Sequence, residues 1–128
     1  MNNQEIILVI EDEQPLANII SDKLSQRGFE VVTARTVQQA INYLKDISNI
    51  KLIWLDHYLI GDKNGLNLVA ELKHEKSEWR QIPIFLVSNS SGLEKQEAYM
   101  TLGVDKYYVK SNYALSDIIE DVEKYLRD

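Results

Sequence analysis

The stretch Ile6-Ile7-Leu8-Val9-Ile10-Glu11-Asp12-Glu13 joins five consecutive apolar residues to three carboxylates. A short continuous apolar run is typical of a strand that helices cover on both faces, as in parallel sheets. Four further short runs follow along the chain: Glu30–Ala34, Leu52–Leu55, Ile82–Val87 and Tyr107–Val109. The sequence therefore predicts five strands.

Longer stretches with apolar residues at helical spacing separate these runs and follow the last one. Local signals mark the expected helix ends: Pro15 and Gly28 for the first helix, Thr36–Gln39 for the second, Gly65 for the third, Ser91–Glu94 for the fourth, and Ser111 or Asn112 for the last. The alternation predicts an α/β fold, a (βα)5 doubly wound five-stranded parallel sheet with right-handed crossovers. A length of 128 residues suits a single domain, residues 1–128.

Composition excludes several classes of function. The chain has no cysteine, and its two histidines, His57 and His74, are too few for a His-rich zinc site. The 14 Lys and Arg residues against 20 Asp and Glu residues give a net charge of −6 without a basic block, so direct nucleic-acid binding and membrane binding are not expected. We see no signal peptide and no membrane span, and we expect a cytoplasmic location.

Chemically active side chains follow four of the five predicted strands. Glu11 and Asp12 follow the first, Asp56 the third, Ser88 the fourth and Lys110 the fifth. Because parallel strands end at one edge of the sheet, these groups should converge there. Crowded carboxylates repel one another, so they either take up a proton or recruit a cation, and an all-oxygen site suits Mg²⁺ (or Mn²⁺). A phosphate dianion could then approach, held by the hydroxyl and the ammonium, while one carboxylate attacks phosphorus to give an acyl phosphate.

The ordered set Ile7–Glu13, Leu55-Asp56, Val87-Ser88 and Tyr107–Lys110 resembles the receiver domains of bacterial two-component response regulators. The resemblance extends from Ile6 to Leu126 and implies a flavodoxin-like sheet of strand order 2-1-3-4-5. It implies a signalling domain that catalyses only its own phosphorylation and dephosphorylation. The expected partners are a sensor histidine kinase or histidine phosphotransfer protein, and an output protein or effector domain, with the domain itself a monomer or weak dimer.

The resemblance also assigns roles at the site. Asp56 matches the phosphoacceptor and, with Asp12, a direct metal ligand. Glu11 matches a ligand that acts through water, and the main-chain carbonyl of Tyr58 matches a further protein ligand.

Three more residues match the phosphoryl-binding and switching groups of the family. Ser88 and Lys110 match the residues that bind the phosphoryl group. Tyr107 matches the aromatic residue that turns inward when the hydroxyl is drawn toward the phosphate. The switch would then alter the surface formed by the fourth helix, the fifth strand and the fifth helix.

The sequence departs from the family pattern at a few positions. Ile60 stands where the family usually has Pro, and Gly65 lies one position late, so the loop after Asp56 is expected to be one residue longer. Asn89 stands where a small residue is usual. Ser111 replaces the Pro that usually follows the lysine, and because a non-proline cis bond costs about 2.5–4 kcal/mol we expect a trans bond there.

Three other functions compete with this interpretation of the sequence. A flavodoxin-like FMN binder would need a phosphate-cradling loop after the first strand, where the three carboxylates would repel phosphate. A haloacid-dehalogenase-type phosphatase would need a second Asp at the position of Tyr58. The third alternative is a pseudo-receiver, which would dock onto partners without being phosphorylated, and it remains open.

Overall fold

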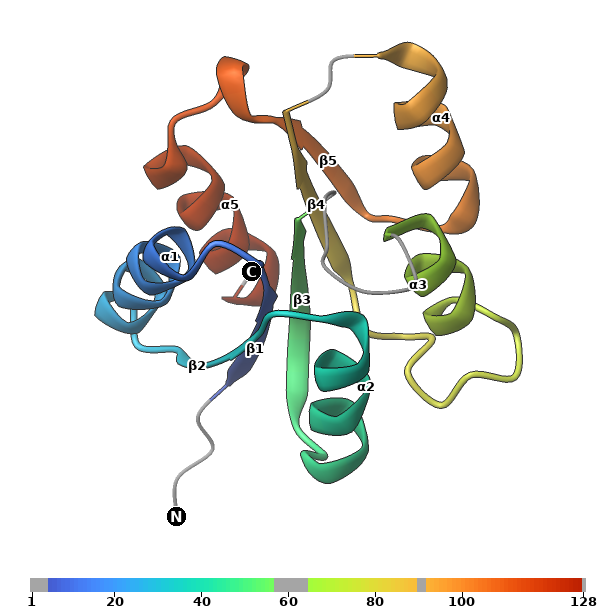
Figure 1. Ribbon diagram of the computed structural model, residues 1–128. Helices are drawn as coiled ribbons and strands as arrows, with labels where there is room; N and C mark the ends of the chain where they lie inside the picture. Colours follow the sequence, from blue (N-terminus) through green and yellow to red (C-terminus); the bar gives the residue numbers. More distant parts are fainter. Residues whose placement is uncertain (1–4, 57–64, 90–91, 128) are drawn as a thin grey trace.

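The computed structural model describes residues 5–56, 65–89 and 92–127, which form alternating strands and helices (Figure 1). The elements are β1 (Ile6–Ile10), α1 (Gln14–Gln26), β2 (Glu30–Ala34), α2 (Val37–Asp46), β3 (Ile50–Asp56), α3 (Gly65–Leu72), β4 (Ile84–Ser88), α4 (Leu93–Leu102), β5 (Lys106–Val109), a 3₁₀ helix (Lys110–Asn112) and α5 (Leu115–Arg127).

The five strands form one parallel sheet in the order β2-β1-β3-β4-β5, which confirms the predicted fold class and strand order. The register aligns the C-terminal ends of the strands along one edge of the sheet, which we call the carboxyl edge. Ile10 pairs with Leu55, Asp56 with Val87, and Ser88 with Val109. The residues that follow β1, β3, β4 and β5 therefore lie side by side at this edge.

Helices cover both faces of the sheet (Figure 1): α1 and α5 lie on one face, and α2, α3 and α4 on the other. Strand β1 supplies both cores in alternation. Ile7 and Val9 pack into the α1/α5 core, whereas Leu8 and Ile10 pack into the α2/α3/α4 core. This period of two explains why the run Ile6–Ile10 is apolar without a break.

Several predicted strand boundaries were wrong, by one residue at the start of β5 and by two at the starts of β3 and β4. β3 begins at Ile50, which pairs with Ile6, rather than at Leu52; the exposed Lys51 hides this start in the sequence. β4 begins at Ile84 rather than Ile82, because Pro83 has no N–H for the ladder and contributes only its carbonyl, which accepts from the Ile53 N–H at 2.9 Å.

Helix starts were predicted with mixed success. The Thr36 hydroxyl accepts from the Gln39 N–H at 3.1 Å, which confirms the N-cap of α2. The prediction that Ser111 or Asn112 caps α5 was wrong: both lie in the 3₁₀ helix, and α5 begins at Leu115. The N-cap residue of α4 is Gly92, and the expected cap Ser91 lies outside the described residues.

Arg127 ties the amino edge of the sheet to α1 and α5. Its guanidinium lies 3.0 Å from a Glu5 carboxylate oxygen and 3.2 Å from one of Glu123, and it donates to the Arg27 carbonyl at 2.9 Å. It also lies 4.2 Å from the centre of the Phe29 ring. Arg27 itself pairs with Glu123 at 2.7 Å. This Arg127 cluster joins three elements at the end of the molecule away from the carboxyl edge.

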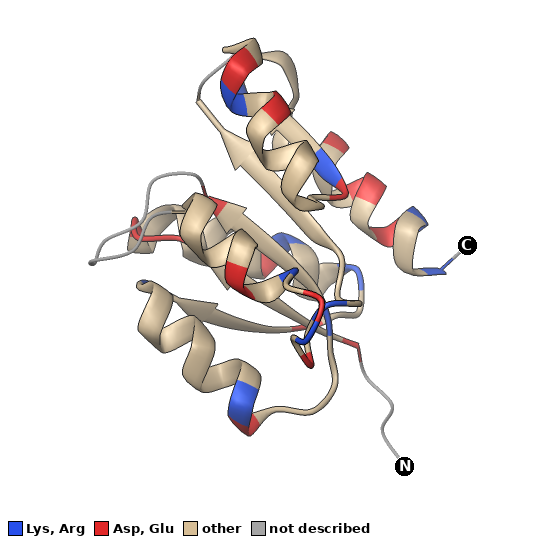
Figure 2. Ribbon diagram, turned by 90° about the vertical axis from the view of Figure 1, so that its right-hand side faces the viewer, with Lys and Arg blue, Asp and Glu red and all other residues tan. Residues whose placement is uncertain are grey.

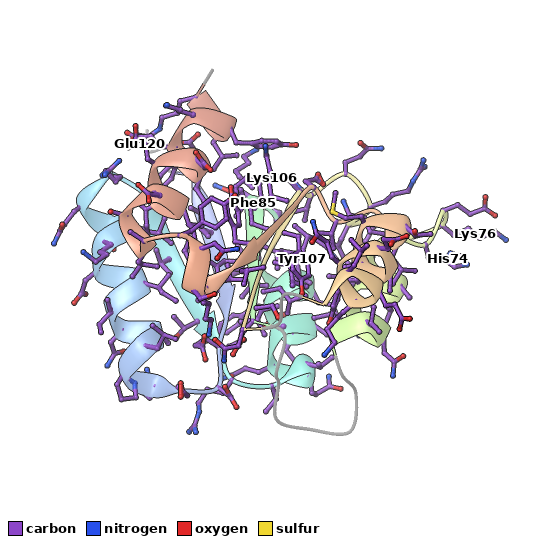
Figure 3. All side chains as sticks on the ribbon, turned by 90° about the horizontal axis from the view of Figure 1, so that it is seen from above. His74, Lys76, Phe85, Lys106, Tyr107 and Glu120 are labelled. Carbon is purple, nitrogen blue, oxygen red and sulfur yellow. The ribbon has the colours of Figure 1, made fainter. Side chains whose placement is uncertain are left out.

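Lys73 closes the long connection between α3 and β4. Its ammonium donates to the carbonyls of Arg80 at 3.0 Å and Ile82 at 2.8 Å, and it lies 3.9 Å from an Asp105 carboxylate oxygen. Burial lowers the pKa of this ammonium. His74 and Lys76, just beyond it, extend away from the body of the protein (Figure 3).

Acidic and basic residues are interspersed along the helices and connections in Figure 2. Within residues 5–56, 65–89 and 92–127, the structure holds no helix that combines the length and apolar character needed to cross a membrane.

Candidate functional site

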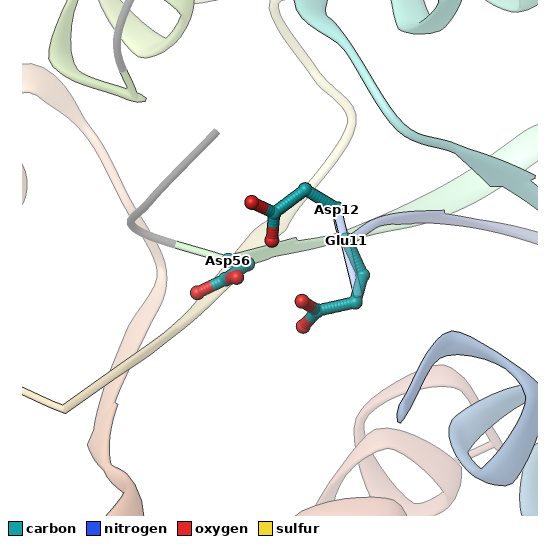
Figure 4. Close-up of side chains that lie close together, drawn as sticks. All are labelled: Glu11, Asp12 and Asp56. Carbon is teal, nitrogen blue, oxygen red and sulfur yellow. The ribbon is translucent and has the colours of Figure 1, made fainter. Parts of the chain in front are cut away.

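Glu11, Asp12 and Asp56 form an acidic cluster at the carboxyl edge (Figure 4). One carboxylate oxygen from each lies within 4.8 Å of the other two. Glu11 and Asp12 directly follow β1, and Asp56 is the last residue of the neighbouring strand β3. Sheet register thus brings together residues that lie more than 40 positions apart in the sequence.

Burial gives this cluster unusual electrostatics. Glu11 is 1% exposed and Asp56 is 5% exposed. Burial, together with a hydrogen bond to Asp56 and the negative charge of Asp56, raises the pKa of Glu11 to about 8. The Glu13 N–H, which donates to Glu11 Oε2 at 3.2 Å, and the Lys110 charge act in the opposite direction. Without a cation, Glu11 therefore retains a proton at neutral pH.

The donor set fits a hard divalent cation. Neighbouring and opposite ligands around Mg²⁺ lie roughly 3–4.2 Å apart, given metal–oxygen distances of about 2.1 Å. The spacing of the three carboxylates is compatible with binding one ion after small adjustments. Such an ion would also replace the proton on Glu11, because metal ligands bind in their deprotonated form.

Lys110 reaches the cluster from the first position after β5. Its Nζ lies 3.8 Å from Asp56 Oδ1, and the ammonium is partly exposed to solvent. The Lys110–Ser111 peptide bond is trans, as expected from the replacement of Pro by Ser. The long side chain therefore reaches Asp56 with an ordinary backbone.

Ser88 ends β4 at the same edge. It is fully buried, it pairs with Val109 of β5, and the preceding Val87 pairs with Asp56. Asn89, which follows it, is exposed. The hydroxyl thus belongs to the strand between β3, which ends at Asp56, and β5, which Lys110 follows.

Tyr107 lies in β5 two residues before Val109, opposite Leu86, and is half-buried (Figure 3). It packs against the α2/α3/α4 core, with its ring centre 6.1 Å from that of Tyr99. Tyr99 is fully buried in α4, and the sequence analysis did not single it out. Its one signal is position: it lies four residues before Gly103, on the face of α4 that meets the sheet.

Two predictions fall on positions whose structure is not described here. Tyr58, the expected main-chain ligand, and Ile60, in the expected longer loop, both lie in residues 57–64, outside the described residues. The roles assigned to Asp56, Asp12, Glu11, Ser88, Lys110 and Tyr107 stay predictions, although the structure places them along one edge of the sheet.

A cavity of about 180 Å³ adjoins the acidic cluster on the α1/α5 face, and the sequence analysis did not anticipate it. Glu11 and Lys110 contribute to its wall, as does Trp54 from the interior of β3. Strand alternation places Trp54 on this face, but the empty volume depends on how α1 and α5 pack against the sheet.

Known proteins match this chain along most of its length. A family model for the response regulator receiver domain matches residues 7–123. The phosphate regulon transcriptional regulatory protein PhoB of Escherichia coli (strain K12) is 30% identical over 121 residues, which are 94% of this chain and 51% of PhoB. This chain thus spans about half the length of that curated relative.

Solved structures agree with the sequence matches. A response regulator receiver protein from Pseudomonas putida has a TM-score of 0.86 and 26% identity, covering 97% of this chain and 99% of that chain. The phosphorylated cyanobacterial phytochrome response regulator RcpA has a TM-score of 0.79 and 28% identity, covering 95% of this chain and 91% of that chain.

Proposed function

The chain belongs to the response regulator receiver family of bacterial two-component signal transduction, and on that basis we propose that Asp56 accepts a phosphoryl group. The donor would be a sensor histidine kinase or a histidine phosphotransfer protein. The observation that carries the proposal is the position of Asp56, between the acidic pair Glu11 and Asp12 and the Lys110 ammonium 3.8 Å away. We further propose that residues 1–128 act as one receiver domain.

Receiver domains bind a divalent metal ion at an acidic pocket, and this chain has such a pocket. Asp12 and Asp56 would hold Mg²⁺ or Mn²⁺ directly, with Glu11 acting through water and the Tyr58 carbonyl as a further ligand. The ion would neutralise negative charge at the phosphoryl oxygens. Without it, Asp56 and its acidic neighbours would repel an incoming phosphate dianion.

In the transfer, an Asp56 oxygen forms a bond to phosphorus in line with the departing imidazole nitrogen. The bond between phosphorus and that nitrogen breaks, and its electron pair stays on the imidazole. Lys110 would pair with a phosphoryl oxygen, and the Ser88 hydroxyl would donate a hydrogen bond to another. Both groups stabilise charge that the carboxylates alone would oppose.

The phosphoryl group would also change the surface of the protein. Movement of Ser88 toward the phosphoryl group opens space beneath Tyr107, which then turns inward against Tyr99. The surface of α4, β5 and α5 would present a different shape to an output protein or effector domain. The domain would work as a monomer or weak dimer.

Phosphorylation of Asp56 is tested with acetyl phosphate as donor, by intact-mass measurement. Wild type should gain one phosphoryl group in Mg²⁺ and lose this gain when EDTA removes the metal. Asp56→Asn should gain none, because its amide is not a nucleophile for phosphorus.

The matched control is Glu13→Gln, which also removes one negative charge next to the cluster but keeps the main-chain N–H that binds Glu11. It should be phosphorylated nearly as fast as wild type. Equal uptake by wild type and Asp56→Asn would contradict the assignment. No uptake by a folded wild-type protein would favour a pseudo-receiver that docks without phosphorylation.

A further inference from the structure

The cavity on the α1/α5 face is large enough for a small molecule. Its volume of about 180 Å³ exceeds that of an engineered cavity of about 150 Å³ that takes up benzene. Much of its wall is apolar, with Leu16 and Ile20 from α1 and Ile118 from α5. An aromatic ring would therefore find hydrophobic contact on two sides.

The wall of the cavity carries a hydrogen-bond donor without a partner among the described residues. Trp54 is 1% exposed and lines the cavity, and its indole N–H donates to no described residue. Among the described residues, the Trp54 N–H is not one of the fully buried side-chain groups that lack a partner, so protein does not seal it off completely. The remaining access of this buried indole is to the cavity.

A second donor, the Lys110 ammonium, lies in the wall where the cavity meets the acidic cluster. The acidic residue in the wall, Glu11, has its carboxyl group occupied by Asp56 and the Glu13 N–H. The other polar groups in the wall are therefore a neutral N–H and a cation, the Lys110 ammonium, which also lies 3.8 Å from Asp56 Oδ1. Such a pair favours a ligand that accepts hydrogen bonds and carries negative charge.

We propose that this cavity binds a small aromatic carboxylate. The ring packs among Leu16, Ile20 and Ile118 against the Trp54 indole, and the carboxylate oxygens accept from the Trp54 N–H and face the Lys110 ammonium. The half-exposed Tyr113 stands at the rim.

Occupation of the cavity would also affect the acidic cluster, and this step rests on the proposed function. The bound carboxylate and a phosphoryl group on Asp56 would compete for the Lys110 ammonium. A saturating ligand should therefore slow phosphorylation by acetyl phosphate.

The two tryptophans allow binding to be measured without any phosphorylation. Each indole N–H gives its own signal in a ¹H–¹⁵N spectrum, and the chain has only Trp54 and Trp79. Trp79 lies in the α3–β4 connection and packs against the core of the opposite sheet face. Titration with benzoate should shift the Trp54 N–H signal to saturation at millimolar concentration and leave the Trp79 signal in place.

Benzyl alcohol, of similar size and uncharged, is the matched ligand control and should bind more weakly by about fivefold or more. Lys110→Met should reduce the affinity for benzoate to that for benzyl alcohol. Leu16→Phe, at a half-buried position, should fill the cavity and abolish the saturable shift with both ligands.

The binding site is refuted if benzoate moves both indole signals in parallel without saturation, or moves neither. Equal affinity for benzyl alcohol and benzoate would overturn the carboxylate specificity. Failure of acetyl phosphate to modify Asp56 would leave the indole titration unaffected, so the two proposals can fail separately.

Discussion

Glu11 differs from ordinary surface carboxylates because the fold buries it beside a second acid. Its pKa rises from 4.5 to about 8, chiefly because of burial and then because of the hydrogen bond and charge of Asp56. In the unfolded chain Glu11 loses its proton near its ordinary pKa, whereas the folded protein keeps it. Between these two values the unfolded state binds fewer protons, so the stability that the proton confers is lost as the pH rises.

We therefore expect the free energy of unfolding in metal-free buffer to fall between pH 4.5 and about 8. Glu11→Gln, which cannot lose a proton, should show a shallower decrease across this window. Added Mg²⁺ should also reduce the decrease in wild type, because the cation replaces the proton. Urea unfolding at several pH values measures each slope.

Glu13→Gln is the control for this pH dependence, since it removes the same charge at an exposed position. Its slope should follow that of wild type. Parallel slopes for wild type and Glu11→Gln would show that Glu11 is not the group responsible.

At the scale of elements, α4 is weakly anchored compared with α5. Tyr99 is the one residue of α4 that is buried, whereas α5 buries Ile118, Ile119 and Val122. Leu93 of α4 is 68% exposed. A helix held mainly by one aromatic side chain can shift when its support changes, and Tyr107 lies directly against that side chain.

We expect Ser88→Ala to separate phosphoryl binding from movement of α4. Beryllofluoride, a phosphoryl mimic, should perturb amide signals near Asp56 in both wild type and the variant. In wild type the shifts should extend through Tyr107 to α4, and in Ser88→Ala they should stay near the acidic cluster, because no hydroxyl is drawn inward.

Asn89→Ala changes the exposed residue next to Ser88 and should leave the spread of shifts intact. If shifts reach Tyr107 equally in wild type and Ser88→Ala, the coupling does not run through the hydroxyl.

For the molecule as a whole, the sequence predicted the features that follow from the order of strands and helices. It did not predict the features that depend on how side chains from different elements pack. The carboxyl edge was predictable because parallel strands end together, so Asp56 and Lys110 had to lie near Glu11. The start of α5 was not predictable, because Ser111 and Asn112 suit a 3₁₀ turn as well as a helix cap. Which carboxylate keeps a proton, and whether a cavity remains beside Trp54, depend on side chains from distant segments, which no local pattern describes.

The Arg127 cluster should contribute to global stability. Arg127→Ala removes two partly exposed ion pairs, a hydrogen bond to a carbonyl and the contact with the Phe29 ring. Because solvent screens the pairs, we expect a loss of about 1–2 kcal/mol in urea unfolding. Lys124→Ala, which breaks only the exposed pair with Glu120, should cost less than about 0.5 kcal/mol.

High salt should reduce the difference in free energy of unfolding between Arg127→Ala and wild type only in part. Salt screens the ion pairs, whereas the contacts of Arg127 with the Phe29 ring and the Arg27 carbonyl are less sensitive to ions. Equal losses for Arg127→Ala and Lys124→Ala would show that the cluster adds nothing beyond a surface ion pair.

The contacts of Lys73 make the α3–β4 connection a natural place for engineering. One ammonium holds the carbonyls of Arg80 and Ile82 next to the end of α3, so residues 74–79 form a loop whose two ends are already fixed in space. Residues inserted at the tip of this loop would not displace β4. They would cost only loop-closure entropy, which grows slowly with loop length. A peptide tag or a fluorescent label could therefore be inserted there, far from the carboxylates at the opposite edge.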